Sequence, residues 1–234
     1  ETRLGSAKFE ALHNAHLSSG VFVYVPKGIE LEHPIEIYHW VAGEKTAVFP
    51  HTLVVTGEQA KVKVVEYFQS ADEGASFTIA VNELIAGAAS SLDYLAVQDL
   101  NEQSKMIQIN ATEVDCDGNA KGFILNIGGG WARNESLSKL VGAGANSDML
   151  SLSIPGKTQE YDQRTFQHHQ VEHTTSDLLY KNSLYDTSRT VFSGLIFVDE
   201  GAHHTDAYQT CRNLLMSQTV EANSMPGLEI NADQ

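Results

Sequence analysis

The sequence is poor in cysteine. Its 234 residues contain only Cys116 and Cys211. Two thiols are too few for a disulfide framework, and their separation is far from the CxxC spacing of a zinc site. Folds stapled by several disulfides or by structural zinc are therefore excluded. We expect both thiols to be free, as in a protein of a reducing compartment.

Positive charge is also scarce. The chain has 15 Lys and Arg residues against 30 Asp and Glu, and its formal net charge is −15. No cluster of Lys and Arg offsets this charge. Because phosphate backbones and anionic lipid surfaces would be repelled, we expect neither nucleic acid nor membrane as a partner.

Long apolar runs are missing as well. No run approaches the ~18 residues that suggest a membrane span, and no charged-then-apolar leader marks secretion. The sequence therefore predicts a cytoplasmic protein, or a protein of the plastid stroma if the source is a plant or an alga.

Helical patterns are confined to the start of the chain. Residues 1–19 are predicted to be a partly helical lead-in segment. From Gly20 onward, runs such as VFVYVP, IEIYHWV and HTLVVTG are rich in β-branched and aromatic residues and are separated by turn signals. Apolar and polar residues alternate within these runs, which is the period of a half-buried strand. We expect residues 20–234 to form one β domain without an internal boundary.

Small-residue turns recur along this domain. They lie at Gly57–Ala60, Ala86–Ala89, Gly118–Ala120, Gly142–Ala145 and Gly201–Ala202. The spacing is about 25 to 32 residues, with one gap near twice that length, and His173–Asp177 falls close to the middle of the gap. A strand–turn–strand repeat of this length predicts a β-solenoid, in which successive coils stack. A β-sandwich of about fourteen short strands is the alternative, because it also spaces strands regularly.

Histidines gather in the second half of the chain. His168, His169 and His173 lie in QHHQVEH, and His203 and His204 follow a turn. The spacing differs from HExxH, in which both ligands share one helical face. On a strand, His169 and His173 would share one face and His168 would lie on the other. Imidazole binds iron and zinc, so His169 and His204 are weak candidate ligands beside the default of solvated turn residues.

Cys211 is the main candidate for chemistry. It stands in the strand-like run AYQTCRNLLM, with Thr210 and Arg212 beside it. A thiol among apolar neighbours behaves as a small hydrophobic group, whereas a nearby Arg favours the thiolate that binds metal or accepts sulfur. From spacing alone the structural and functional interpretations weigh equally. Cys116 lies between two Asp residues that oppose ionisation, so we expect it to be structural or incidental.

Several ordered blocks in the second half form a recognisable set. They are Gly129–Gly130 with Arg133–Asn134, Gly142–Ala145, His168–His169, His173–Thr174, Ser176–Lys181, Arg189–Ile196, Gly201–Ala202, Thr205–Thr210, Arg212–Ser217, Pro226–Ile230 and Ala232–Asp233. This set resembles the SufB/SufD family of the SUF iron–sulfur cluster assembly system, and within it the SufD branch. Two positions depart from SufD. Cys211 stands where SufD proteins commonly have Asn and SufB has its key Cys, and Ser224–Met225 replaces the usual Thr-Lys before Pro226.

The resemblance implies a right-handed parallel β-helix core with helical regions on both sides, so we expect this chain to be a core fragment without those regions. It also implies a subunit that is not an enzyme by itself, pairs with a SufB-type paralogue and works with the SufC ATPase. The pairing surface would lie at the last strand, at Pro226, Leu228, Glu229 and Ile230. A nascent iron–sulfur cluster shared with SufB would be held transiently, with Cys211 as the candidate cluster or sulfur ligand and no tightly bound cofactor.

Other functions stay open at this point. One is a SufB-type scaffold subunit, which Cys211 favours. Another is a carbohydrate-active β-helix enzyme, which would need a secretory leader, clustered acidic residues and groove aromatics, whereas Trp40 and Trp131 are the only tryptophans. A third is a structural interaction module without metal. Self-pairing of the chain in the absence of its partner also stays open.

Overall fold

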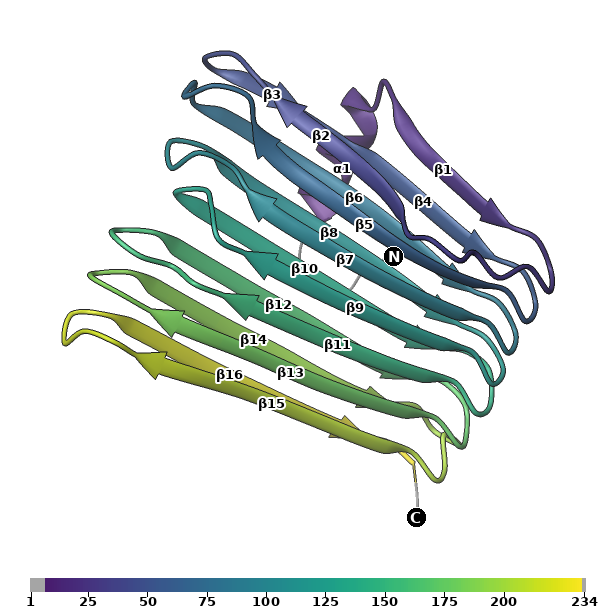
Figure 1. Ribbon diagram of the computed structural model, residues 1–234. Coiled ribbons are helices and arrows are strands. Elements are labelled where there is room, and N and C mark those ends of the chain that lie inside the picture. The colour runs from purple at the N-terminus through teal and green to yellow at the C-terminus, as the bar shows by residue number, and fades with distance from the viewer. Residues whose placement is uncertain (1–6, 233–234) are drawn as a thin grey trace.

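The protein is a rod of stacked β coils. The computed structural model describes residues 7–232, so the first six residues of the expected lead-in segment and the last two residues of the expected core lie outside the described part. Each coil contributes one strand to each of two sheets, and the seven strands of the smaller sheet count seven coils (Figure 1). The predicted parallel β-solenoid is confirmed.

Successive strands alternate between the two sheets. Sheet A contains β1 (Gly20–Val25), β3 (Thr46–Val48), β4 (His51–Thr56), β6 (Ser76–Ala86), β8 (Lys105–Val114), β10 (Trp131–Leu140), β12 (Glu160–His169), β14 (Arg189–Val198) and β16 (Glu221–Ile230). Sheet B contains β2 (Ile35–Val41), β5 (Lys61–Ser70), β7 (Ser91–Asp99), β9 (Asn119–Asn126), β11 (Asn146–Ser153), β13 (Thr175–Leu184) and β15 (Asp206–Leu215).

Every strand pairing in residues 7–232 is parallel. The two sheets face each other, as in a sandwich, but the chain passes from one to the other at every coil. A sandwich built from hairpins would instead pair its strands antiparallel. The β-sandwich alternative is therefore wrong.

The register gives the length of a coil. One position of sheet B recurs at Lys61, Ser91, Asn119, Asn146, Thr175 and Asp206, which are 27 to 31 residues apart. This agrees with the spacing predicted from the small-residue turns. The gap in that series is filled by the turn at His173, which forms a corner without glycine.

The corners between sheet A and sheet B share one backbone conformation. A left-handed residue occurs in each, at Gly28, Gln59, Ala89, Asp117, Gly144, His173 and His204. For residues other than glycine this conformation costs about 1–2 kcal/mol. Hydrogen bonds between coils offset part of that cost, since the amide of Ala89 donates to the Cys116 carbonyl oxygen (2.8 Å) and the amide of His173 donates to that of His203 (2.9 Å).

The core lies between the sheets and changes character along the rod. In the first coils the inward positions are largely apolar, as at Val54, Val64, Phe68 and Leu84. In later coils many of them are small and polar, as at Ser147, Ser151, Ser153, Gln163, Thr165 and Gln167. The Gln163 amide donates to the Ser153 hydroxyl (2.9 Å) and the Gln167 amide donates to that of Ser176 (2.7 Å). The interior therefore combines packing with hydrogen bonds across the sheets.

One helix, α1 (Ala7–His16), occurs in the described residues, and it packs against β6 on the outer face of sheet A. No helix between residues 7 and 232 is long and apolar enough to cross a membrane.

Candidate functional site

The C-terminal end of the rod is open. β15 and β16 are the last strands of their sheets, so each has one edge without a neighbouring strand. Their inward residues continue the rows of the coil above, because Cys211 lies in register with Tyr180 and Leu228 lies in register with Ile196. Tyr180 and Ile196 are buried, whereas Leu228 is 63% exposed. The described chain therefore ends in a coil whose core side has no cover.

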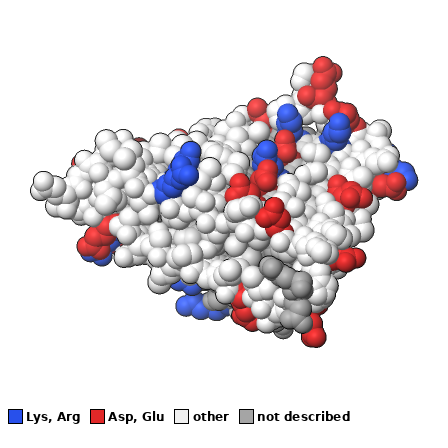
Figure 2. All heavy atoms as spheres, turned by 90° about the horizontal axis from the view of Figure 1, so that it is seen from below, with Lys and Arg blue, Asp and Glu red and all other residues white. Residues whose placement is uncertain are grey.

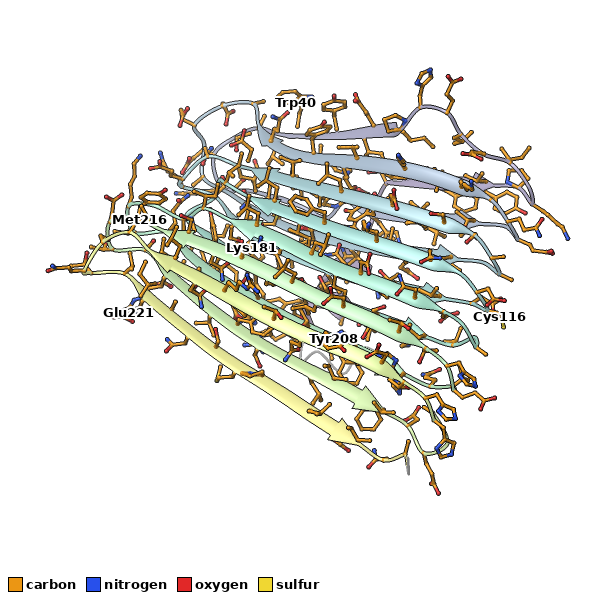
Figure 3. All side chains as sticks on the ribbon, turned by 60° about the horizontal axis from the view of Figure 1, so that its bottom comes forward. Trp40, Cys116, Lys181, Tyr208, Met216 and Glu221 are labelled. Atoms are coloured by element: carbon orange, nitrogen blue, oxygen red, sulfur yellow. The ribbon has the colours of Figure 1, made fainter. Side chains whose placement is uncertain are left out.

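This last coil is unusually apolar. The exposed large apolar side chains on it are Tyr208, Leu214, Leu215, Met216, Met225, Leu228 and Ile230. Figure 2 looks onto the rod from below and shows acidic and basic side chains near the middle and at one side of the view, with uncharged surface between them. Figure 3 shows Tyr208 and Lys181 on the outer face of sheet B and Met216 at the turn toward β16. By register, Leu228 and Ile230 lie on the core side, whereas Tyr208 lies on the outer face of sheet B and Met225 on that of sheet A. The core-side row is a candidate contact surface.

A pocket of about 510 Å³ opens at the same end. Its apolar wall comes from Ile196, Val198, Ala202, Ala207, Leu228, Ile230 and Ala232, and its rim carries His203, His204 and Thr205. The predicted interface residues lie beside it. By register Pro226, Leu228 and Ile230 face inward and Glu229 faces outward. Proline lacks an amide hydrogen and is tolerated in an edge strand such as β16.

Cys211 points into the rod at this open end. Its Sγ atom lies 3.5 Å from the Ser224 hydroxyl oxygen on β16 and 3.9 Å from both the Asn213 Oδ1 and Asn182 Nδ2 atoms. Burial raises the pKa of the thiol, and its hydrogen bonds with Ser224 and Asn213 lower the pKa by less. Alternation along the strand puts Arg212 on the other face. Arg212 is therefore not among the groups that contact the thiol, and burial favours the neutral form of Cys211.

His169 lies at the end of β12 inside the core and is fully buried. Its Nδ1 atom is 2.7 Å from the Thr174 hydroxyl and its Nε2 atom is 2.8 Å from that of Ser176. Burial, aided by the nearby His168, lowers its pKa to about 4. Both ring nitrogens are therefore engaged, and ligation of a cluster by His169 would break one of these hydrogen bonds.

His204 lies at a corner and is exposed. Its ring stacks on that of His173, with centroids 4.8 Å apart and planes inclined by 14°. Within residues 7–232 no three His, Cys, Asp or Glu side chains are close enough to hold a metal ion. Cys211, His169 and His204 thus do not form one ligand set within this chain.

Two neighbours of Cys211 escaped the sequence analysis. Ser224 approaches it from the facing sheet, and nothing in the local sequence indicates this contact. Asn182 is different, because it precedes Cys211 by 29 residues, about one coil. The repeat length would have placed it beside the thiol.

Known proteins resemble this chain over nearly its whole length. Residues 39–234 match the family described as SUF system FeS cluster assembly, SufBD core domain. An iron–sulfur cluster assembly SufBD family protein of Staphylococcus saprophyticus is 27% identical over 227 residues, and one of Staphylococcus aureus strain USA300 is 26% identical over 228 residues. Each alignment covers 97% of this chain and 49% of the relative, so the chain spans about half the length of the curated relatives it matches. The chain belongs to the SufBD core domain family of the SUF iron–sulfur cluster assembly system.

Proposed function

We propose that the chain acts as a SufD-type subunit of an iron–sulfur cluster assembly scaffold. It pairs with a SufB-type paralogue through its last coil and works with a SufC-type ATPase, whose ATP hydrolysis supplies the driving force. The chain catalyses no reaction by itself. The nascent cluster is its cargo, held transiently at the junction of the two subunits in the cytoplasm, or in the stroma for a plastid protein.

The apolar inward row of the last described coil is the observation that carries this proposal. An apolar inward row ending at Leu228 and Ile230 is costly in water, at roughly 25 cal/mol per Å² of exposed apolar surface. The free edges of β15 and β16 also offer unpaired amide and carbonyl groups. A second solenoid end would satisfy both requirements by adding strands to the two sheets. The names of the relatives support cluster assembly as the process that this pairing serves.

Cys211 is the group proposed to meet the cluster. A thiolate is a suitable soft ligand for iron and an acceptor for sulfur. Its position beside the free edges would place it at the junction between subunits. The SufD-type assignment rests on the sequence blocks from Gly129 onward, whereas Cys211 is a feature of SufB. A SufB-type subunit is therefore the second candidate.

The pairing can be tested with a charge placed in the inward row. Leu228→Asp should weaken binding of the co-expressed SufB-type subunit at least about tenfold, because a carboxylate would be buried in an apolar contact. The matched control is Phe22→Asp on β1. Phe22 is 66% exposed at the opposite end of the rod, against 63% for Leu228. Titration calorimetry with purified subunits would measure both, and equal affinities for Leu228→Asp and wild type would refute the pairing surface.

The ligand role is tested separately. In the assembled complex, Cys211→Ser should abolish cluster formation after anaerobic addition of iron and sulfide, as seen by visible absorbance, without changing circular dichroism. Cys116→Ser alters an exposed thiol at a corner and should leave the absorbance unchanged. Full cluster content in Cys211→Ser would remove Cys211 from the site while leaving the pairing proposal intact.

A further inference from the structure

At the other end of the rod, the contact between α1 and sheet A is centred on one histidine. His13 is the one residue of α1 that is buried, and it is fully so. Phe9 of the same helix and Phe49 pack partly buried against an apolar strip formed by Ile79, Val81, Ile107 and Ile109. Because the helix contributes little other buried surface, its docking depends on how well His13 is satisfied.

The two nitrogens of His13 contact different strands. Nδ1 lies 2.9 Å from the carbonyl oxygen of Ile79 on β6, and Nε2 lies 3.1 Å from Nδ1 of His51 on β4. The Nε2 atom of His51 lies 3.3 Å from a carboxylate oxygen of Glu83. A chain of polar contacts thus runs from Ile79 through both imidazoles to Glu83.

The donors and acceptors along this series of polar contacts favour one protonation state of the two histidines. A carbonyl oxygen and a carboxylate only accept, so the outer nitrogens, Nδ1 of His13 and Nε2 of His51, must carry hydrogen. The two inner nitrogens face each other and need one further hydrogen between them. Three protons on two rings satisfy every contact and give one positive charge beside Glu83. A fourth proton would bring two N–H groups and two positive charges face to face. Loss of the third proton would bring two nitrogen lone pairs face to face.

We propose that His13, His51 and Glu83 form a proton-controlled latch, which holds α1 on sheet A while the two rings share three protons and releases it when the fourth proton binds. Release uncovers the apolar strip of Ile79, Val81, Ile107 and Ile109, whose side chains are at most 7% exposed with α1 in place. The latch lies at the opposite end of the rod from the proposed pairing surface, and it does not depend on the proposed function.

Acid is the direction of release. Burial lowers the pKa of His13, and the charge of His51 lowers it further, against opposing effects of the Ile79 carbonyl and Glu10. The charged and titratable groups that act on His13 are His51 on β4 and Glu10 on α1 itself, and Glu83 on β6 contacts His51. Because the pKa of His13 is depressed in the docked state, docking weakens as the pH falls below about 6.5. At higher pH the two rings lose the third proton, so docking is expected to be strongest near pH 6.5.

The test measures how often α1 opens. Trypsin cleaves after Lys8 only when α1 is locally unfolded, since Lys8 lies within the helix. Cleavage of the full chain is followed by mass spectrometry at about pH 8, 6.5 and 5, with an unstructured reference peptide in the same tube to correct for the activity of trypsin. We expect cleavage after Lys8 to be slowest near pH 6.5 and to rise by up to about tenfold per pH unit below it.

Two variants and one control make the result specific. His13→Leu keeps an apolar contact but cannot bind a proton, so its cleavage rate should not vary with pH. His51→Gln removes the second charge, so the rise in cleavage rate at acid pH should become smaller. This variant also provides the test if His13→Leu does not fold. His33→Gln, an exposed loop histidine, should behave as wild type. The latch is refuted if wild type shows no acid-side rise, or if His51→Gln keeps the full rise.

Discussion

Single buried side chains decide how this rod responds to acid. His169 is enclosed by polar groups of the last coils, and its pKa of about 4 means that the folded state resists its protonation. An unfolded chain would protonate the same ring near pH 6.5. Because the folded-state pKa is depressed, stability from this group is complete above pH 6.5 and declines as the pH falls toward 4.

The expected loss from His169 is about 3 kcal/mol between pH 6.5 and pH 4. Urea unfolding at about pH 7 and pH 4.5 would measure it as a difference between wild type and His169→Gln, which has no titrating group. His173→Gln is the matched control, since His173 is exposed at a corner. An equal decline in all three proteins would show that the acid sensitivity arises elsewhere.

At the residue scale, the sequence predicted which side chains are candidates for chemistry better than it predicted their surroundings. It singled out Cys211 as the main candidate for chemistry. It could not indicate that Ser224 approaches from the facing sheet, because that contact depends on how two strands of one coil are set against each other. Nor could it pair His13 with His51, which are 38 residues apart, because His13 belongs to a helix outside the repeat.

Glycines in the strands and corners act in two different ways. Gly122 on β9 lies in register between Tyr94 and Met149, and a Cβ atom placed there would meet nothing within 4 Å. It borders a small cavity of about 30 Å³. At the corner residue Gly142, a Cβ atom would lie 2.0 Å from the backbone nitrogen of Cys116 in the adjacent coil.

Opposite effects of alanine are therefore expected at the two glycines. Gly122→Ala should raise the free energy of unfolding by about 0.4–1 kcal/mol, because it restricts the unfolded chain without strain. Gly142→Ala should lower it by about 1–3 kcal/mol through overpacking between coils. Thermal melts of both variants beside wild type would measure this. A destabilising Gly122→Ala would mean that the cavity is needed by its neighbours.

At the scale of elements, the corners made the fold predictable. Most combine small residues with a left-handed conformation, and this signal recurs once per coil. The corner at His173 carries the same conformation without the small residues, which is why the sequence showed a double gap there. The polar interior of the later coils was not predicted, because inward serines and glutamines have the same sequence pattern as solvated ones.

The whole molecule behaves as a one-dimensional stack, in which each coil contacts only its neighbours. The terminal coil has one neighbour, so local unfolding should cost least there. In hydrogen exchange, we expect amides of β15 and β16 in the isolated chain to exchange at least about tenfold faster than those of β8 and β10. Addition of the SufB-type partner should slow exchange in β15 and β16 selectively. Uniform protection along the free rod would contradict this view.

Parallel stacking also fixes the distance between the two ends. Neighbouring strands in a sheet lie about 4.8 Å apart, so every coil of nearly 30 residues adds that increment to the length of the rod. Duplication or loss of one coil would shift α1 relative to β16 by the same amount and leave both local structures as they are. Relatives with different numbers of coils would therefore differ in reach by whole multiples of this increment.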